Sequence, residues 1–370
     1  MSRSKPLKVI ISGGGTGGHV FPALAIANAL KEQVQNIRIL FVGAKGRMEM
    51  KKVPDAGYHI IGLNISGLQR KFSWKNFLVP FKLAASLMSS RKIIRKFKPD
   101  LVIGVGGYAS APILRAATLA KVPSLIQEQN SYAGITNKIL AKKVDKVCVA
   151  YENMDRFFPK EKIYLTGNPV RKMILDAANK KEEALKYFSL DEKKKVVLVV
   201  GGSLGALSIN TAIQKSLSLL IENNIQLIWQ TGKYFFDQAK QSVSKMQSDL
   251  LKVYEFIDRM DMAYGASDLV VSRAGAISVS EIAALNKPAI LVPSPNVAED
   301  HQTQNAMALV NINAAILVKD HLAGEILGPA IVELIYDEKK LFELQEKITR
   351  LAYKDAARNI ATVALSLVKD

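Results

Sequence analysis

Residues 7–19 read LKVIISGGGTGGH, an apolar run that passes directly into a glycine-rich turn. Residues 196–206, VVLVVGGSLGA, repeat that arrangement in the second half of the chain. Elsewhere, short runs rich in Val, Ile and Leu alternate with longer segments of helical period, which is typical of parallel sheets covered by helices. With 370 residues the chain is too long for one ordinary core. We therefore predict an α/β protein with two doubly wound domains.

The predicted strands divide between the two halves of the chain. In the first half they span residues 7–12, 37–43, 58–64, 100–107, 123–129, 146–151 and 162–167. In the second half they span residues 196–200, 226–230, 252–257, 268–272, 288–293 and 314–318. The tail after residue 337 indicates helices, and the last of these can return to the first domain. The expected domains are residues 1–168 with a helix at about 352–370, and residues 169–351.

The composition restricts the partners and the compartment. Lys and Arg number 51 and Asp and Glu number 33, which gives a formal net charge of +18. Such a surface attracts phosphates, nucleic acid or anionic lipid, and charge alone does not choose among them. The single cysteine, Cys148, favours a reducing cytoplasm. No apolar run approaches the roughly 18 residues of a membrane-spanning helix, and the run at residues 7–12 is too short for a signal peptide. We expect a protein that is neither exported nor integral to a membrane.

The first glycine-rich turn fits the pattern G-x-G-x-x-G with Gly13, Gly15 and Gly18. Backbone amides and a helix start can approach a phosphate there, because no Cβ stands in the way. A dinucleotide-binding domain would also carry an acidic residue after the second strand, where this chain has Lys45. An NADP-dependent enzyme could use Lys45 at that position, so an NADP-dependent oxidoreductase stays as an alternative. The ATP-binding pattern G-x-x-x-x-G-K-[ST] does not occur in the sequence.

Several polar residues follow predicted strands and are candidates for chemistry. His19 can take a proton from an attacking hydroxyl, or only cap the loop. Ser203 in the second turn can hold a diphosphate, or simply form the turn. Glu281, early in a helix, can accept hydrogen bonds from vicinal hydroxyls, or complement the helix dipole. Residues 300–305, DHQTQN, can read sugar hydroxyls or form a solvated first turn.

Metal chemistry is not expected. The sequence contains no Asp-x-Asp, and its four histidines lack the paired spacing of metal ligands. Helix N-termini and Arg171 would then have to neutralise a leaving diphosphate.

Residues 56–99 contain no acidic residue but nine Lys and Arg side chains, with aromatic and aliphatic residues between them. Rings that enter the headgroup layer beside lysines that meet anionic lipid are typical of an interfacial membrane contact. We predict such a contact through Trp74, Lys75, Phe77, Phe81 and Lys82. The alternative is a solvated lysine face over an ordinary core helix. Nucleic acid is not favoured, because no nucleic-acid-binding motif accompanies the charge.

Taken together, seven segments in this order resemble the family 28 glycosyltransferases, and among them the bacterial enzymes that add N-acetylglucosamine to lipid-linked muramyl-pentapeptide at the cytoplasmic face of the membrane. The segments are residues 13–27, 104–110, 128–138, 166–171, 201–206, 272–282 and 299–306. The resemblance implies two Rossmann-like domains facing across a cleft (glycosyltransferase B type) and an inverting, metal-independent transfer without a cofactor. It also implies UDP-N-acetylglucosamine as donor, the lipid-linked muramyl-pentapeptide as acceptor and a peripheral location. Another lipid or metabolite UDP-sugar transferase, or a module that only senses a UDP-sugar, stays as an alternative.

The resemblance also implies roles for individual residues. His19 is the expected base, with Glu128 as the next carboxylate to consider. The acceptor is expected to contact Gly14, Gly15, Gly106, Gly107, Tyr108 and Gln129. The donor is expected to contact Thr16, Gly17, Gly18, Asn130, Arg171, Ser203, the backbone of Ile257, Ala276, Ile277, Ser278, Val279, Ser280, Glu281 and Gln302. The chain has Leu204 where the family often has Gln, which weakens any side-chain contact there.

Overall fold

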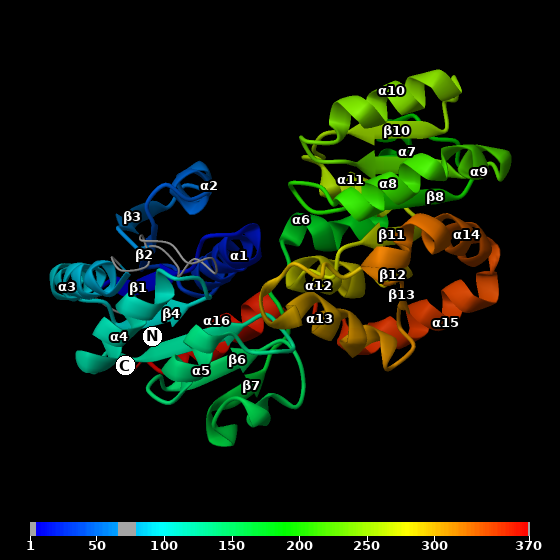
Figure 1. The fold of residues 1–370 in the computed structure, drawn as a ribbon. Coiled ribbons are helices and arrows are strands. Elements are labelled where there is room, and N and C mark those ends of the chain that lie inside the picture. The colour runs from blue at the N-terminus through cyan, green and yellow to red at the C-terminus, as the bar shows by residue number, and fades with distance from the viewer. Residues whose placement is uncertain (1–4, 66–78, 369–370) are drawn as a thin grey trace. The chain divides into compact units, whose positions relative to one another are not determined.

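The computed structural model describes residues 5–65 and 79–368, and the contacts within it divide the chain into two compact units. The first unit comprises Met1–Arg171 and Asp355–Asp370, and the second comprises Lys172–Lys354. The unit boundaries lie three residues after the expected ones at residues 168 and 351. Each unit contains one parallel sheet with helices packed on it (Figure 1). The predicted α/β class with two Rossmann-like domains is therefore confirmed.

The sheet of the first unit has seven strands in the order β3-β2-β1-β4-β5-β6-β7, all parallel. The strands are β1 (Leu7–Ser12), β2 (Ile37–Ala44), β3 (His59–Leu63), β4 (Leu101–Gly104), β5 (Ser124–Glu128), β6 (Lys146–Val149) and β7 (Ile163–Leu165). The strand order reverses between β1 and β4. Ligands of such sheets bind beyond the carboxyl ends of the strands at this point.

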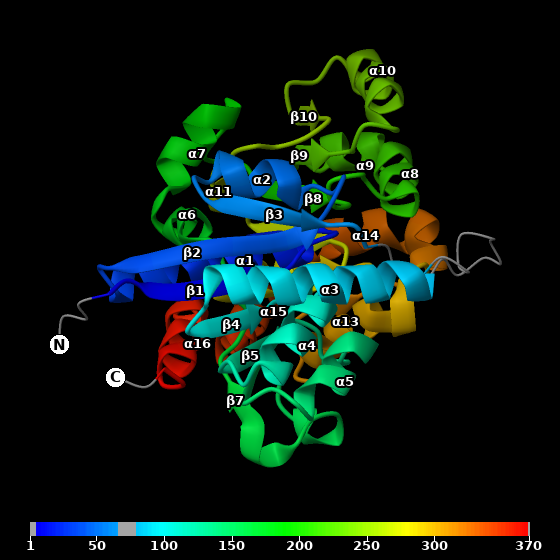
Figure 2. The ribbon, with the colours of Figure 1, turned by 90° about the vertical axis from the view of Figure 1, so that its left-hand side faces the viewer.

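Helices cover both faces of this sheet, because successive side chains of a strand point to opposite faces. On β1, Val9 and Ile11 pack on one face and Ile10 on the other. The first face is covered by α1 (Gly17–Gln33) and α16 (Ala356–Leu365), and the second by α3 (Val79–Phe97), α4 (Ser110–Leu119) and α5 (Ile135–Ala141). Figure 2 shows α3 running along the sheet next to α4. The other helices of the described residues in this unit are α2 (Glu49–Asp55), which packs against β2 and β3, and the 3-10 turns η2 (Met154–Arg156) and η3 (Lys160–Lys162).

The sheet of the second unit has six parallel strands in the order β10-β9-β8-β11-β12-β13. They are β8 (Val196–Val200), β9 (Gln226–Gln230), β10 (Leu251–Tyr254), β11 (Leu269–Ser272), β12 (Ala289–Leu291) and β13 (Ile316–Leu317). The helices are α6 (Lys172–Leu175), α7 (Lys181–Phe188), α8 (Leu207–Lys215), α9 (Leu217–Glu222), α10 (Phe236–Met246), α11 (Met260–Ala266), α12 (Ala276–Ala284), α13 (His301–Val310), α14 (Ala323–Tyr336) and α15 (Glu338–Ile348). Short 3-10 turns are η4 (Asp176–Asn179), η5 (Ala298–Asp300), η6 (Asp320–Leu322) and η7 (Thr349–Leu351). Val197, Val199 and the fully buried Trp229 form part of the core with residues of α8, α14 and α15.

Several strands are shorter than predicted, because the apolar runs continue into turns. The strand expected at residues 100–107 ends at Gly104, since Gly106 and Gly107 have φ of 91° and 84° and turn the chain. The strand expected at residues 314–318 is reduced to the two residues of β13.

The predicted membrane contact lies mostly outside the described residues. Trp74, Lys75 and Phe77 fall within residues 66–78, and the side chain of Phe81 is likewise not described. Lys82 lies near the start of α3 and is half-buried. Within the described ranges, no helix is long and apolar enough to span a bilayer.

Candidate active site

In the first unit, the predicted site residues gather at the carboxyl edge of the sheet. Residues 13–18, the first glycine loop, follow β1, and the Gly106–Tyr108 turn follows β4 beside it. Glu128 ends β5, the next strand, and residues 129–130 follow it. Gly107 has φ of 84°, and a Cβ there would collide with the carbonyl oxygen of Gly14. The glycines therefore allow the loops after β1 and β4 to touch.

Glu49, the first residue of α2, supports the first glycine loop through hydrogen bonds. It is 0% exposed, and its carboxylate accepts hydrogen bonds from the backbone N–H groups of Gly15 and Ala44, each at 2.9 Å. A Cβ at Gly14 would collide with this carboxylate. The amide of Gly15 is thus engaged by Glu49, and Gly17 and Gly18 at the start of α1 provide a helix N-terminus suited to an anion.

His19 lies in the first turn of α1 with its ring held from two sides. The Nδ1 atom is 3.2 Å from the hydroxyl oxygen of Thr16, the residue that caps the helix. On the other side, a Cβ at Gly106 would lie 2.7 Å from Nε2, so the ring packs directly on that glycine. With Nδ1 at Thr16, Nε2 is the nitrogen next to the loop after β4, where it can take a proton.

Glu128 organises the loop after β5. Its side chain is 2% exposed, and Oε1 accepts from the backbone N–H and the side-chain amide of Asn130, at 3.0 and 3.2 Å. Oε2 accepts from the N–H of Gly134 at 3.1 Å and from Asn137 Nδ2 at 2.9 Å. Four hydrogen bonds therefore hold a carboxylate that would have to release one of them to act as a base.

Buried amides join the remaining loops of this edge. Gln127 Nε2 donates to Asn168 Oδ1 at 2.9 Å, and Asn168 Nδ2 donates to the carbonyl of Gln129 at 2.9 Å. Gln129 Nε2 in turn donates to the carbonyl of Val105 at 2.7 Å. The segment at residues 166–171 is thereby tied to the loops after β4 and β5.

Two expected ligand contacts have long side chains at this edge. Tyr108 is 55% exposed. The guanidinium of Arg171 lies 4.9 Å from the ring centre of Phe21 on α1, which places a cation beside the helix that starts at the first glycine loop.

In the second unit, residues 201–206 form a second glycine loop after β8. The N–H of Gly205 donates to the carbonyl of Gly202 at 3.0 Å, which closes a turn around the exposed Ser203. Gly205 has φ of 79°, and a Cβ there would collide with the carbonyl oxygen of Thr231, the residue directly after β9. Asn210 Nδ2 donates to the same carbonyl at 2.8 Å, so α8 also holds the two loops together.

The predicted donor segment, residues 276–281, is the first part of α12, which follows β11. Glu281 is only 5% exposed, and Tyr264 donates its hydroxyl hydrogen to Glu281 Oε2 at 3.3 Å. The carboxylate is therefore oriented by a neighbouring helix. Gln302, in the first turn of α13, accepts from the backbone N–H of Ser294 through Oε1 at 2.8 Å.

The loop after β10 carries Ile257, which is 4% exposed. Its backbone N–H donates to Gln230 Oε1 at 2.9 Å. Arg259, two residues further along the chain, makes two hydrogen bonds to Asp261, from Nε at 2.9 Å and from Nη2 at 2.7 Å. These bonds, aided by Lys180, lower the pKa of Asp261 to about 2.

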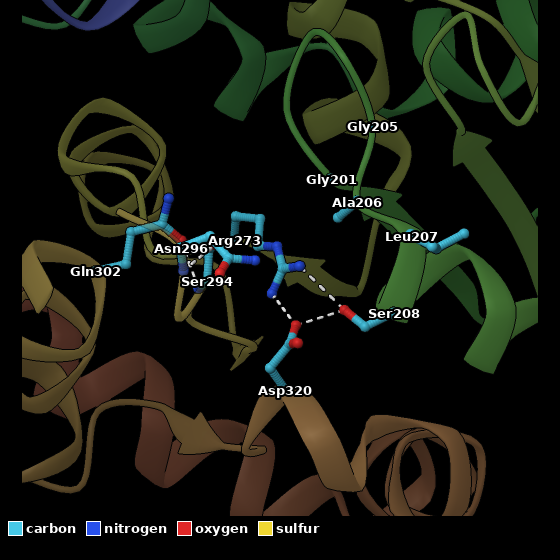
Figure 3. A pocket seen from close by; sticks show the side chains of 10 residues that line it. All are labelled: Gly201, Gly205, Ala206, Leu207, Ser208, Arg273, Ser294, Asn296, Gln302 and Asp320. Atoms are coloured by element: carbon cyan, nitrogen blue, oxygen red, sulfur yellow. Dashed lines mark hydrogen bonds and ion pairs between the residues drawn. The ribbon is translucent and has the colours of Figure 1, made fainter. Parts of the chain in front are cut away.

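A cavity of about 540 Å³ opens beside the second glycine loop (Figure 3). Its lining consists of Gly201, Gly205, Ala206, Leu207, Ser208, Arg273, Ser294, Asn296, Gln302 and Asp320. Arg273 points into it, donates to the carbonyl of Val292 and to Ser208 Oγ, both at 3.0 Å, and forms an ion pair with Asp320. Arg273 therefore joins the strand ends of β11 and β12 to α8 and η6. Such a polar cavity over a glycine loop and helix starts suits a phosphorylated ligand.

No cluster of three metal-ligating side chains occurs in the described part of the chain.

Models of glycosyltransferase family 28 match both halves of the chain. The N-terminal domain of the family matches residues 9–149, and its C-terminal domain matches residues 196–360. The chain is also 54% identical over 368 residues to a transferase of Bacteroides thetaiotaomicron, with 99% of each chain covered. The chain belongs to glycosyltransferase family 28. The membership expected from the seven segments is thus confirmed, and with it a glycosyltransferase.

Two relatives of the chain carry the same name. The Bacteroides protein and one from Parabacteroides distasonis, 52% identical over 361 residues with 98% of each chain covered, are both named UDP-N-acetylglucosamine–N-acetylmuramyl-(pentapeptide) pyrophosphoryl-undecaprenol N-acetylglucosamine transferase. Among solved structures, MurG of Acinetobacter baumannii is 30% identical and superposes with a TM-score of 0.78, covering 98% of this chain and 100% of its own.

The sequence did not indicate Glu49, Gln230 or the partners of Arg273. Glu49 and Gln230 are polar residues at the carboxyl edge of their sheets, one just after β2 and the other at the end of β9. That position was the available signal. Arg273 lies in residues 272–282, one of the seven segments that resemble the family, but its partners Ser208 and Asp320 are distant in sequence.

Proposed function

We propose that this family 28 glycosyltransferase transfers N-acetylglucosamine from UDP-N-acetylglucosamine to the C4 hydroxyl of lipid-linked N-acetylmuramyl-pentapeptide, a step of peptidoglycan synthesis. The observation that carries the proposal is identity above 50% over nearly the whole length to transferases of that name. Similarity of this extent disfavours an oxidoreductase, a UDP-sugar sensor or a transferase for another acceptor.

The second unit is the proposed donor-binding part. Ser203 of the second glycine loop and the start of α12 donate to the diphosphate oxygens. The polar cavity beside residues 201–206 supports a phosphorylated ligand at this loop. Glu281, oriented by Tyr264, accepts from the ribose hydroxyls. Because Gln230 engages the N–H of Ile257, the carbonyl is the main-chain group of Ile257 left to accept from uracil N3–H.

The first unit is the proposed acceptor- and membrane-binding part. The acceptor contacts the loops after β1, β4 and β5, at Gly14, Gly15, Gly106–Tyr108 and Gln129. Thr16, Gly17, Gly18, Asn130 and Arg171 are the contacts of this unit with the donor. Arg171 and the start of α1 offset the charge of the departing diphosphate.

In the proposed reaction, the C4 oxygen attacks the anomeric carbon of N-acetylglucosamine from the side opposite UDP, and the bond between that carbon and the diphosphate oxygen breaks. UDP leaves with the bonding electrons, and the configuration at the anomeric carbon inverts. His19 Nε2 takes the proton of the C4 hydroxyl, and Thr16 holds the ring through Nδ1. Glu128 fixes the loop that carries Gln129 and Asn130.

The test is release of UDP from UDP-N-acetylglucosamine with and without the lipid-linked acceptor, in the presence of EDTA. We expect release only with the acceptor, and at a rate that EDTA does not change. Release without an acceptor, or with simple sugars alone, would contradict the proposed substrate. Loss of UDP release when EDTA is added would contradict the metal-independent mechanism.

The proposed location is the cytoplasmic face of the membrane, as a peripheral protein held by Trp74, Lys75, Phe77, Phe81 and Lys82. Each base near an anionic surface contributes about 1 kcal/mol. Replacing the three aromatic residues by Ser, or the two lysines by Glu, should therefore release the protein from anionic vesicles and leave activity on a soluble short-chain acceptor unchanged. Sedimentation equal to that of the parent protein would show that docking uses another surface.

A further inference from the structure

Gln230 is a buried polar residue that the proposed reaction does not use directly. It is the last residue of β9, the strand next to β8, and its side chain is 3% exposed. It lies at the carboxyl edge of the sheet, between the second glycine loop after β8 and the Ile257 loop after β10.

Both ends of the Gln230 amide are hydrogen-bonded, each to a different loop. Oε1 accepts from the backbone N–H of Ile257 at 2.9 Å, and Nε2 donates to the carbonyl of Gly202 at 3.1 Å. The partners fix the orientation of the amide, because an N–H requires an acceptor and a carbonyl requires a donor. An uncharged amide meets both requirements without binding a proton. A carboxylate keeps only the first bond, and an apolar side chain keeps neither.

We propose that Gln230 is a positioning residue that couples two subsites of the donor nucleotide. One hydrogen bond sets the peptide of Ile257 for the uracil, and the other sets the turn at Gly202 for the diphosphate. The inference rests on the proposed function, since it assumes that the second unit binds UDP. It adds a residue whose bond to Gly202 can be broken while its bond to Ile257 is kept.

Two variants of Gln230 distinguish the effect of its bond to Gly202 from the effect of both bonds together. Gln230→Glu keeps an oxygen for the N–H of Ile257 but places a carboxylate oxygen against the carbonyl of Gly202. Gln230→Met, similar in length, removes both bonds. UDP affinity is measured by calorimetry, uridine affinity by NMR titration, and the exchange rate of the Ile257 amide by hydrogen exchange.

We expect Gln230→Glu to weaken UDP at least roughly fivefold, because one hydrogen bond is lost and a carboxylate oxygen then faces the carbonyl of Gly202, with uridine affinity and Ile257 exchange changed less than twofold. Gln230→Met should weaken both ligands and speed exchange at Ile257. The matched controls are Gln226→Glu and Gln226→Met. Gln226 begins the same strand, is also buried, and its amide bonds Asp191 at the opposite edge of the sheet. These controls should lower Tm and leave both affinities unchanged.

The inference is overturned if Gln230→Glu weakens UDP and uridine equally, or if neither Gln230 variant differs from the Gln226 controls. These results would leave the proposed function intact, because the parent protein would still bind UDP. A parent protein that binds neither UDP nor uridine would instead overturn the donor site itself, and the coupling with it.

Discussion

Glu49→Gln tests whether a buried carboxylate sets the shape of the first glycine loop. Glu49 accepts from Gly15 and from Ala44, one N–H at each oxygen. The amide of Gln has one oxygen, so one N–H must face an NH₂ group instead. A hydrogen bond to a charged group contributes about 1.5–3 kcal/mol. We take about 2 kcal/mol for the loss, which corresponds to a roughly 30-fold rise in the population of the open loop.

Hydrogen exchange read by mass spectrometry measures this opening. Peptides covering residues 13–18 and 42–46 should exchange roughly 30-fold faster in Glu49→Gln, and turnover should fall because His19 follows the same loop. The matched control is Asp145→Asn, which weakens bonds to the N–H and hydroxyl of Ser124 at the opposite edge of the same sheet. It should change exchange near residue 124 and leave turnover unchanged. Unaltered exchange at Gly15 and Ala44 in Glu49→Gln would refute the reasoning.

Three further predictions concern single side chains. Glu281→Ala should weaken UDP-N-acetylglucosamine by about 1.5–3 kcal/mol in calorimetry, with Tyr264→Phe weakening it less; unchanged affinity in a folded variant would contradict the ribose contact. His19→Ala should lower turnover by roughly 10²–10⁴ fold with little change in donor affinity, whereas a parallel fall of both would assign His19 only to the shape of the loop. The pKa of Asp261 is lowered to about 2, chiefly by the hydrogen bonds from Arg259, so its contribution to stability is present above the ordinary pKa near 3.8 and is lost as the pH falls toward 2. Asp261→Asn should remove that part of the pH dependence of Tm between pH 4 and 2, and an unchanged profile would contradict it.

The sequence predicted the sheets well, because buried parallel strands are continuous apolar runs. Strands β1, β8 and β9 begin and end at the predicted residues. Some other ends were misplaced where apolar residues continue past the strand, as at Val105, which is fully buried but follows the last residue of β4. Hydrophobicity reports burial and not the φ and ψ angles that end a strand.

The parts of the site that the backbone forms could be predicted from the sequence. The side chains that stabilise those parts could not. Glycine loops leave a local pattern in the sequence, as at residues 13–18 and 201–206. Support of those loops depends on pairs such as Glu49 with Gly15, or Arg273 with Asp320, which are 34 and 47 residues apart. One chain contains no local signal of such pairs, so they emerge only when the strands are placed side by side.

The return of the chain to the first unit has a consequence for its synthesis on the ribosome. Helix α16 packs against α1, and Gln33 Nε2 donates to the carbonyl of Arg358 at 3.0 Å. Translation at 5–20 residues per second needs roughly 10–40 seconds to pass through Lys172–Lys354, which lie between the two segments of the first unit. During that interval the face of α1 that α16 covers has no partner in its own unit. The second unit, by contrast, is one continuous segment. Although its synthesis starts later, it is complete before the first unit, which still lacks Asp355–Asp370 at that point.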